Sequence, residues 1–593
     1  MSKLPSQTAL PTFSVLVEGK DVTTTYEVVS IRVQKEVNRI GTAYIEILDG
    51  NVSTATFEAS EKSDFEPGKK IEIRAGYHSK EETIYKGIVT SQSLQVLTGM
   101  ASKMIIECKD EAIKLTVGRK NRYFLNSKDS DIITTILGDY TLSHEVDSST
   151  VTQKEVIQYH ATDWDFILMR AELNSMLAYV DDGKLSIKKP ELSGGEKLTL
   201  TYGDNIYELD TMLNSRSQFA ATEAMAWDPS TLATVTQTGT EPSVNQQGDL
   251  TGKKLAEVLG LSKLELMHTG VLETTELKAW ADAQLFKSRL SKIQGTIKVQ
   301  GNALVKIGDI IKVEGLGSRF NGSAFVSGLT HEMAEGNWKT NYKMGVNEKW
   351  FSSMPDIHEP RAAALFPAVP GLQIGTVLKL EGDPDNAFRV QVKLPLLDSK
   401  SEGVWARIAR FYASADIGAF FMPEIGDEVV VGFLNDDPRF PVILGMFNSS
   451  KLAAPLKPTD ANPQKKLVTK SKLSLLFDDE KKFVEITTPA KNTVTISDDG
   501  KSITLLDQSN NKVELSTDGI LLDSTKDINI KAASNINKQA GANIAIKATG
   551  NMDASGVNVS HKANAMFSAS GNAGAELKTS AIATIQGTLV KIN

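Results

Sequence analysis

Apolar and polar residues alternate over most of the first 115 positions of the chain. The clearest runs are FSVLVEG, YEVVSIRVQKEV, GTAYIEILDG, KKIEIRAGY and KMIIECKDE, and Gly, Asp, Asn or Ser residues separate them. A period of two places successive side chains on opposite faces of a strand, so one face can be buried while the other stays in water. The pattern predicts a mainly β protein whose first domain, residues 1–116, is a tube-like β-barrel.

The period changes to helical spacing further along the chain. DSDIITTILGDY and DWDFILMRAELNSM carry apolar residues at helical spacing after an Asp or Ser that can cap a helix, and another helix is predicted near residues 273–293. LAYVDDGKLSIKK is typical of a hairpin with Asp182 and Gly183 as its turn. We therefore expect an α/β insertion over residues 117–200 and a second β-barrel over residues 201–355.

Two proline-containing stretches, 356–371 and 450–472, are predicted to be linkers. Between them, residues 372–449 contain five short alternating runs: IGTVLKL, FRVQVKL, VWARIAR, GDEVVVGFL and FPVILGMF. Five strands in so short a segment are typical of a small closed barrel such as an OB-fold.

The last part of the chain, residues 473–593, repeats a much sparser pattern. From Asp527 to Gly556 the sequence divides into units of about eight residues, and each has one large apolar residue at its second position. These residues are Ile528, Ile536, Ile544 and Met552. One such side chain per unit cannot enclose a core in a single chain, because ordering each residue costs about 1–2 kcal/mol. An intertwined β-helix, a prism wound from three identical chains, would bring three of these side chains together on one axis.

A disordered polar tail is the alternative for this segment, since its Ala, Asn, Ser and Lys content permits it. Disorder, however, requires neither an apolar residue at every eighth position nor the alternation that precedes it. We therefore favour the trimeric needle.

Composition restricts the function. The 593 residues carry a net charge of -8, which argues against a broad nucleic-acid interface because such surfaces are normally basic. The single cysteine, Cys108, excludes an intrachain disulfide and is expected in a core. No apolar run at the N-terminus resembles a signal peptide and no run is long enough to span a membrane, so synthesis in the cytoplasm without a signal peptide is expected.

Catalytic and metal-binding patterns are weak. Asp427, Glu428, Asp436 and Asp437 cluster in the sequence, but Gly426-Asp427 and Asp437-Pro438 are ordinary turn sequences between strands. The histidines do not have the spacing of a metal site, and no phosphate-binding loop or nucleophile motif occurs in the right context. The prediction is a protein without catalytic residues, metal or cofactor.

Two motifs resemble a known family. PEIGDEVVVGFLNDDPRFPVILG is similar to the OB-fold motif of spike proteins of contractile injection systems: the VgrG proteins of type VI secretion, their counterparts in extracellular phage-tail-like particles, and the fused hub and spike of contractile phages. The matching residues include Pro423, Gly426, Asp427, Glu428, Phe433, Asp437, Pro438, Pro441 and Gly445, whereas Asp436 replaces the usual glycine. The segment Glu155–Pro190 resembles the phage "late control" signature through Gln158, Tyr159, Trp164 and Phe166.

The resemblance implies a homotrimer whose hub, built from two barrels per chain, adapts a sixfold inner tube to a threefold membrane-puncturing needle. Its expected partners are an inner tube ring protein, baseplate proteins, a PAAR-like tip protein and, transiently, the target membrane. We expect the tip protein to dock on Leu589, Val590 and Ile592. The particle would be secreted or would deliver across an envelope, and the sequence does not distinguish a type VI system, an extracellular particle or a phage.

A trimeric tailspike or adhesin that binds a receptor or degrades a polysaccharide is the alternative function. Such an enzyme needs two carboxylates facing a groove. The gap of roughly 25 residues between the barrel and the first needle strand is too short for a folded enzyme domain. We therefore expect a structural protein.

Overall fold

A computed structural model describes residues 4, 10–355, 357–396, 400 and 402–592. Two expectations lie outside the described residues: the absence of a signal peptide, which concerns mainly residues 1–9, and the end of the needle at Asn593. The chain divides into two compact units, Met1–Met446 and Phe447–Asn593, and each is described by itself.

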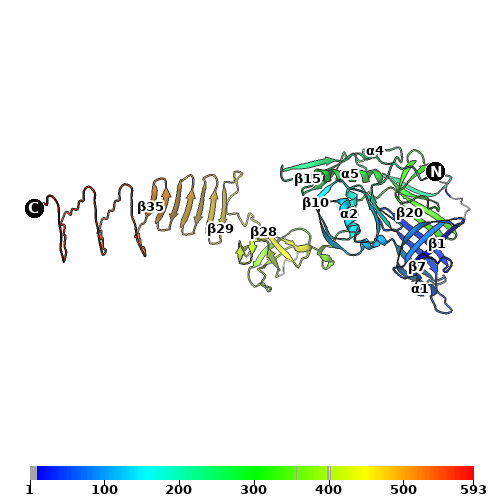
Figure 1. The fold of residues 1–593 in the computed structure, drawn as a ribbon, viewed down its shortest axis with the longest axis horizontal. Coiled ribbons are helices and arrows are strands. Elements are labelled where there is room, and N and C mark those ends of the chain that lie inside the picture. Colours follow the sequence, from blue (N-terminus) through cyan, green and yellow to red (C-terminus); the bar gives the residue numbers. More distant parts are fainter. Residues whose placement is uncertain (1–3, 5–9, 356, 397–399, 401, 593) are drawn as a thin grey trace. The chain divides into compact units, whose positions relative to one another are not determined.

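A 13-stranded sheet is the largest element of the first unit (Figure 1). Its strands are β1 (Pro11–Val17), β2 (Lys20–Asp21), β3 (Val28–Glu36), β4 (Thr42–Leu48), β5 (Lys70–Tyr77), β6 (Lys80–Gln95), β7 (Lys103–Lys109), β13 (Leu198–Thr201), β14 (Ile206–Leu213), β18 (Ile293–Gln300), β19 (Ile310–Glu314), β20 (Gly322–Ala334) and β21 (Asn337–Met344). A short helix, α1 (Glu58–Glu61), lies between β4 and β5.

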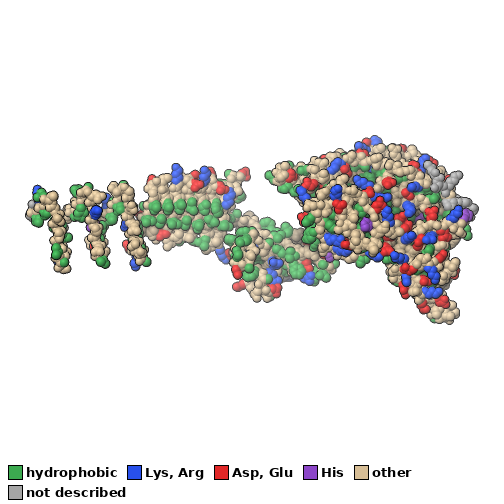
Figure 2. Space-filling model, viewed as in Figure 1, with side chains coloured by type: hydrophobic (Ala, Val, Ile, Leu, Met, Phe, Trp, Pro, Cys, Tyr) green, Lys and Arg blue, Asp and Glu red, His purple; other side chains and the backbone are tan. Residues whose placement is uncertain are grey.

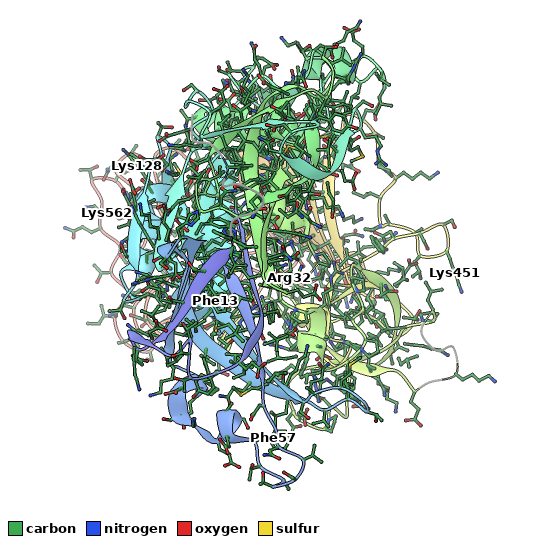
Figure 3. The ribbon with its side chains drawn as sticks, turned by 90° about the vertical axis from the view of Figure 1, so that its right-hand side faces the viewer. Phe13, Arg32, Phe57, Lys128, Lys451 and Lys562 are labelled. Carbon is green, nitrogen blue, oxygen red and sulfur yellow. The ribbon has the colours of Figure 1, made fainter. Side chains whose placement is uncertain are left out.

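The two predicted hub barrels are joined in this sheet. β3 pairs antiparallel with β20, and Arg32 Nε lies 3.6 Å from Glu332 Oε1 across the pair (Arg32 is labelled in Figure 3). Each half keeps its own apolar core, and Cys108 is buried in the first, as expected. β3 and β20 each pair within their own half and also with each other, which joins the two halves into one sheet. Within the described residues neither half closes into a ring.

The insertion has the predicted α/β character. It contains β8 (Lys120–Lys128), α2 (Asp129–Leu137), β9 (Ser143–Val146), β10 (Thr152–Ala161), α3 (Asp163–Leu173), β11 (Leu177–Asp181) and β12 (Lys184–Lys188). The two helices and the sheets share one apolar core. The predicted hairpin turn is present: Asp182 and Gly183 both have positive φ, 55° and 87°, as a two-residue turn requires.

A three-stranded sheet between β14 and β18 in the sequence was not anticipated. It contains β15 (Thr222–Asp228), β16 (Ala233–Thr238) and β17 (Leu264–His268), and it packs on the predicted helix, α5 (Thr274–Leu290), through a core around Ala224, Leu266 and Leu277. A one-turn helix, α4 (Gly252–Ala256), precedes β17.

The predicted five-stranded barrel is confirmed. β22 (Gln373–Lys379), β23 (Val390–Lys393), β24 (Val404–Ile408), β27 (Glu428–Phe433) and β28 (Pro441–Met446) close in the order β22-β23-β24-β28-β27. Val390, Val392, Val429, Val431 and Ile443 are fully buried inside it. A short hairpin, β25 (Ala413–Ser414) and β26 (Ile417–Gly418), is inserted between β24 and β27.

The second unit begins with a seven-stranded antiparallel meander (Figure 1). Its strands are β29 (Gln464–Val468), β30 (Ser474–Asp478), β31 (Phe483–Thr487), β32 (Thr493–Ser497), β33 (Ser502–Leu506), β34 (Lys512–Ser516) and β35 (Gly519–Asp523). β29 lies inside the stretch 450–472 that was predicted to be a linker. After β35 no strand occurs among the described residues, and residues 525–592 are exposed.

The single chain therefore shows a meander where strands of a β-helix were expected, followed by an irregular backbone over the octads. An intertwined prism takes its strand partners from other chains, so one chain by itself cannot show it. Among the described residues, no helix is both long and apolar enough to cross a membrane.

Candidate functional site

One face of the meander is almost entirely apolar. Cross-strand register places its residues in two rows. The first row is Leu467, Leu475, Ile486, Val494, Leu505, Val513 and Leu522, and the second is Lys465, Phe477, Val484, Ile496, Ile503, Leu515 and Ile520. We call these two rows the apolar face, and Figure 2 shows it as a continuous hydrophobic area over β29–β35.

The apolar face has no cover within its own unit. Ile486, Ile496 and Leu505 are 51%, 50% and 45% exposed, and no hydrophobic core forms among the described residues of 447–592. Burying apolar surface is worth about 25 cal/mol per Å². Soluble monomers rarely leave a contiguous apolar patch of more than a few hundred Å² in water, so this face indicates a partner.

The opposite face of the meander is suited to water. Its central row is Lys466, Leu476, Glu485, Thr495, Thr504, Glu514 and Leu521. The hydroxyls of Thr487 and Thr495 donate to the Glu485 carboxylate at 3.0 and 3.4 Å, and Lys512 pairs with Glu514. The sheet thus has the alternation of a half-buried sheet although nothing in its own unit buries it.

The predicted needle-core residues are exposed in the single chain. Ile528, Ile536, Ile544 and Met552 have 53%, 51%, 56% and 67% of their surface in water. The predicted tip-docking residues Leu589, Val590 and Ile592 are 72%, 47% and 87% exposed. The chain itself brings none of these residues into a core.

The hub motif is mainly structural. Trp164 and Phe166 are buried in the core of the insertion, and the Gln158 amide is buried beside them. Gln158 Nε2 donates to Asp163 Oδ1 at 2.8 Å and to the Ala161 carbonyl at 3.1 Å, which joins the end of β10 to the start of α3. Tyr159 points the other way and is 73% exposed.

Asp163 is a buried carboxylate at the first turn of α3. Lys120 Nζ lies 2.7 Å and the Tyr140 hydroxyl 2.6 Å from Asp163 Oδ2. Burial alone would raise the pKa of Asp163, but hydrogen bonds from Gln158, Lys120 and Tyr140 outweigh it and hold the pKa below its usual value. The folded hub therefore favours the ionised form of Asp163.

The OB-fold motif shapes turns. Gly426 has φ 94° and Asp436 has φ 56°, a left-handed conformation that suits the glycine expected at position 436. Asp427 Oδ2 accepts from the Glu424 N–H at 2.8 Å, while Pro423 is buried in the loop before β27 and Pro441 is buried at the start of β28. The motif carboxylates Asp427 and Asp437 therefore stabilise turns, and nothing in their geometry resembles a paired catalytic site.

Asp437 also orients a neighbouring side chain. Its two carboxylate oxygens accept from the Arg439 guanidinium at 3.0 and 2.7 Å, and this guanidinium lies 4.1 Å from the ring centroid of Phe366. Phe366 belongs to the predicted linker 356–371. The turn of the OB-fold motif therefore contacts that linker.

The linker is anchored rather than free. The Val369 N–H donates to the Asp436 carbonyl at 2.8 Å, and Arg119 of the insertion donates to the Ile357 carbonyl at 3.3 Å. Just before the linker, the Phe351 N–H donates to the buried Glu172 carboxylate at 2.7 Å. Arg119, Phe366 and Arg439 were not predicted as contact residues, because isolated arginines and one phenylalanine give no periodic signal.

The described residues contain no group of His, Cys, Asp and Glu side chains arranged to hold a metal ion. His331 is fully buried against Thr340 at 2.8 Å, and burial together with nearby Lys35 lowers its pKa to about 3. It is a neutral core histidine.

Comparison with known proteins matches both parts of the first unit. Residues 7–335 match the family model described as the Alg8 N-terminal domain, and residues 373–447 match the type VI secretion system/phage-baseplate injector OB domain. The tail protein of Neisseria meningitidis MC58 is a similar solved structure, with a TM-score of 0.44 and 14% identity over 58% of this chain and 99% of that chain.

Two curated relatives come from Vibrio cholerae. The type VI secretion system spike protein VgrG3 is 34% identical over 96 residues, which are 15% of this chain and 9% of VgrG3. The actin cross-linking toxin VgrG1 is 38% identical over 87 residues, which are 13% of this chain and 8% of VgrG1. The chain thus matches less than a tenth of the length of either relative.

The first family model covers more than half of the chain, and the OB-domain model covers the OB-fold motif found in the sequence. The chain belongs to the Alg8 N-terminal domain family, and its OB domain and the VgrG relatives identify it as a VgrG or phage-tail spike protein.

Proposed function

We propose that this protein is the structural hub and central spike of a contractile injection system, and that it works as a homotrimer. The apolar face of the meander is the observation that carries this proposal. Three copies that turn these faces toward a common axis bury them together and leave their polar faces in water. The result is a stiff prism that can transmit an axial force.

The octads continue the same arrangement. Three copies of Ile528, Ile536, Ile544 and Met552 would meet on the axis, and strand pairing between chains would satisfy the backbone groups that the single chain leaves unpaired. Substituting Ile544 with Asp would place three carboxylates on that axis. Like charges in a desolvated site repel strongly, so the melting temperature of the trimer should fall.

The two halves of the 13-stranded sheet form the hub in this proposal. Two related halves in each of three copies give six similar units around the axis, which suits a sixfold inner tube. Baseplate proteins would surround the hub, and a PAAR-like tip protein would dock on Leu589, Val590 and Ile592. The exposure of these three side chains is compatible with such a partner.

The function is that of a puncturing device without a reaction of its own. The polysaccharide-degrading tailspike is less well supported, because Phe567 is the only aromatic residue after position 490 and sugar-binding grooves usually need aromatic rims. The machine, whether a type VI system, an extracellular particle or a phage, would deliver its cargo across the envelope of a target cell.

Sedimentation velocity of the full-length protein at micromolar concentration tests the proposal. We expect a single elongated trimer. A well-folded monomer, with the meander protected from hydrogen exchange, would overturn it, because a stable meander would then need no partner.

A further inference from the structure

The five-stranded barrel has two exposed apolar patches of its own. The first, which we call the hairpin patch, lies on and around the β25–β26 hairpin. It consists of Phe411, Tyr412, Ile417, Phe420 and Phe421, which are 88%, 55%, 59%, 68% and 59% exposed. Aromatic side chains each bury about 150–250 Å² when they are covered, so leaving four of them in water within one short loop is unusual for a monomer.

The second patch, which we call the wall patch, is on the outer wall of the barrel. It consists of Leu372, just before β22, Ile374 on β22 and Leu444 on β28, which are exposed, together with the half-buried Val430 on β27. Ile374 lies directly opposite Val430, and a Cβ at Gly432 would lie 3.4 Å from Leu372 and 3.5 Å from Leu444. Because Gly432 has no side chain, the surface between the two leucines is shallow.

A charged group flanks each patch. Arg410, at the base of the hairpin, stacks 4.6 Å from the Phe420 ring centroid, and its Nη2 donates to Met422 Sδ at 3.0 Å. Among the described residues it has no carboxylate partner, and its buried Nη1 has no hydrogen-bond acceptor. Glu428 is next to the wall patch on β27, two residues before Val430, and its carboxylate has no ion pair or side-chain hydrogen bond with any residue that the structure describes. The hairpin patch thus has a cation beside it and the wall patch an anion.

We propose that the hairpin patch of one copy packs on the wall patch of the next copy, with Arg410 of the first facing Glu428 of the second. The two patches are different surfaces of one barrel, so the contact is heterologous. Repeated by a third of a turn, such a contact closes into a ring of three and leaves neither patch in water. This inference rests on the trimer proposed above and adds a second interface, separate from the needle.

The size of the patches supports this partner. A stable protein–protein interface buries about 800 Å² on each side. The four aromatic side chains of the hairpin would each bury about 150–250 Å² if fully exposed, and because they are only 55–88% exposed they supply about half of that area. The opposite charges at the two borders also favour one register over a displaced one.

Cross-linking of the full-length protein tests the ring. The variant Phe420→Cys/Leu444→Cys, treated with a short bis-maleimide, should give covalent dimers and trimers on a denaturing gel, whereas each single variant should stay monomeric. The native thiol of Cys108 is buried and should not react. Phe420→Cys/Phe388→Cys is the matched control, because Phe388 is 76% exposed on the same barrel but outside both patches.

The charge pair is tested in the same assay. Arg410→Glu should lower the cross-linking yield of the double-cysteine variant by about fivefold, and adding Glu428→Arg should restore it, as expected for a close charge pair across an interface. A trimer in sedimentation that does not cross-link, or that cross-links equally in the Phe388 control, would overturn the ring and leave the proposed function intact. A monomer in sedimentation would overturn the trimer itself.

Discussion

The barrel and the meander are built from similar short strands, yet they treat their apolar residues differently. In the barrel, β22 pairs with β27, so the sheet closes and buries Val429, Val431 and Ile443 completely. In the meander the two end strands, β29 and β35, remain unpaired on one side, and Ile496 stays half exposed. A sheet that closes on itself makes its own core, whereas this open one leaves its apolar residues for a partner, which we propose to be other copies of the chain.

This difference predicts how each region responds to concentration. The barrel is expected to fold at any dilution, because its core lies within one chain. The stability of the meander should rise with protein concentration, since association and folding are linked in such a segment.

A charge on the apolar face should abolish the trimer. Ile496→Lys would bring three ammonium groups into the proposed core, and burying an unpaired charge is prohibitive. Thr495→Lys is the matched control, because this neighbour on β32 lies on the polar face opposite Glu485. Sedimentation should show monomers for the first variant and trimers for the second. A trimeric Ile496→Lys protein would show that the apolar face is not the interface.

A cavity in the barrel core should act differently. Ile443→Ala removes a fully buried side chain and should lower the free energy of unfolding of the barrel by about 2–5 kcal/mol. Chemical denaturation followed by hydrogen exchange in β27 should show this loss to the same extent at low and high protein concentration. A loss that vanishes at high concentration would mean that the barrel, too, depends on association.

The Asp163 network should make the hub sensitive to acid. Because the pKa of Asp163 is lowered in the folded state, its contribution to stability is present above the ordinary aspartate pKa of about 3.9 and is lost as the pH falls through the lower folded value. Asp163→Asn should cost about 1–3 kcal/mol at neutral pH and should weaken this acid dependence.

Asp139→Asn is the control for that variant. Arg122 lies 3.4 Å from Asp163 Oδ2 and 2.8 Å from Asp139 Oδ2, but the Asp139 side chain is 56% exposed. Thermal unfolding from pH 7 to pH 3 compares the two variants. Equal effects of both would contradict a special role for the buried carboxylate.

The sequence predicted those elements whose pattern is local. The helices α2, α3 and α5, the Asp182-Gly183 turn and the five barrel strands follow from periodicity and turn residues within a few positions. The β3–β20 pair could not be predicted in this way, because the partners are separated by almost 300 residues and each strand has an ordinary alternating pattern. The octads posed the opposite problem, since their pattern indicates a core that a single chain does not contain.

For the candidate site residues, the two sequence motifs did not predict which side chains are buried or which contacts they make. Gln158, Trp164 and Phe166 proved to be buried, whereas Tyr159 of the same motif is exposed. Asp437 was expected to act only in a turn, yet it also positions Arg439 against Phe366. Such contacts depend on the tertiary path of the linker, which proline content alone does not reveal.

The smallest expected effect concerns that linker. If Arg439 holds Phe366 against the barrel turn, Arg439→Ala should make the linker more accessible, and chymotrypsin should cleave the Leu365–Phe366 bond about threefold faster, the order expected for one exposed cation–π contact. Arg389→Ala is the matched control: Arg389 pairs with Asp383 at 2.6 Å in the same Asp–Arg geometry but stacks on no aromatic ring among the described residues. Arg439→Lys keeps the charge and loses the planar stacking, so its cleavage rate should lie between those of the parent and the alanine variant. Equal cleavage of the parent and Arg439→Ala would show that the backbone bond from Val369 to Asp436 holds the linker without help from the arginine.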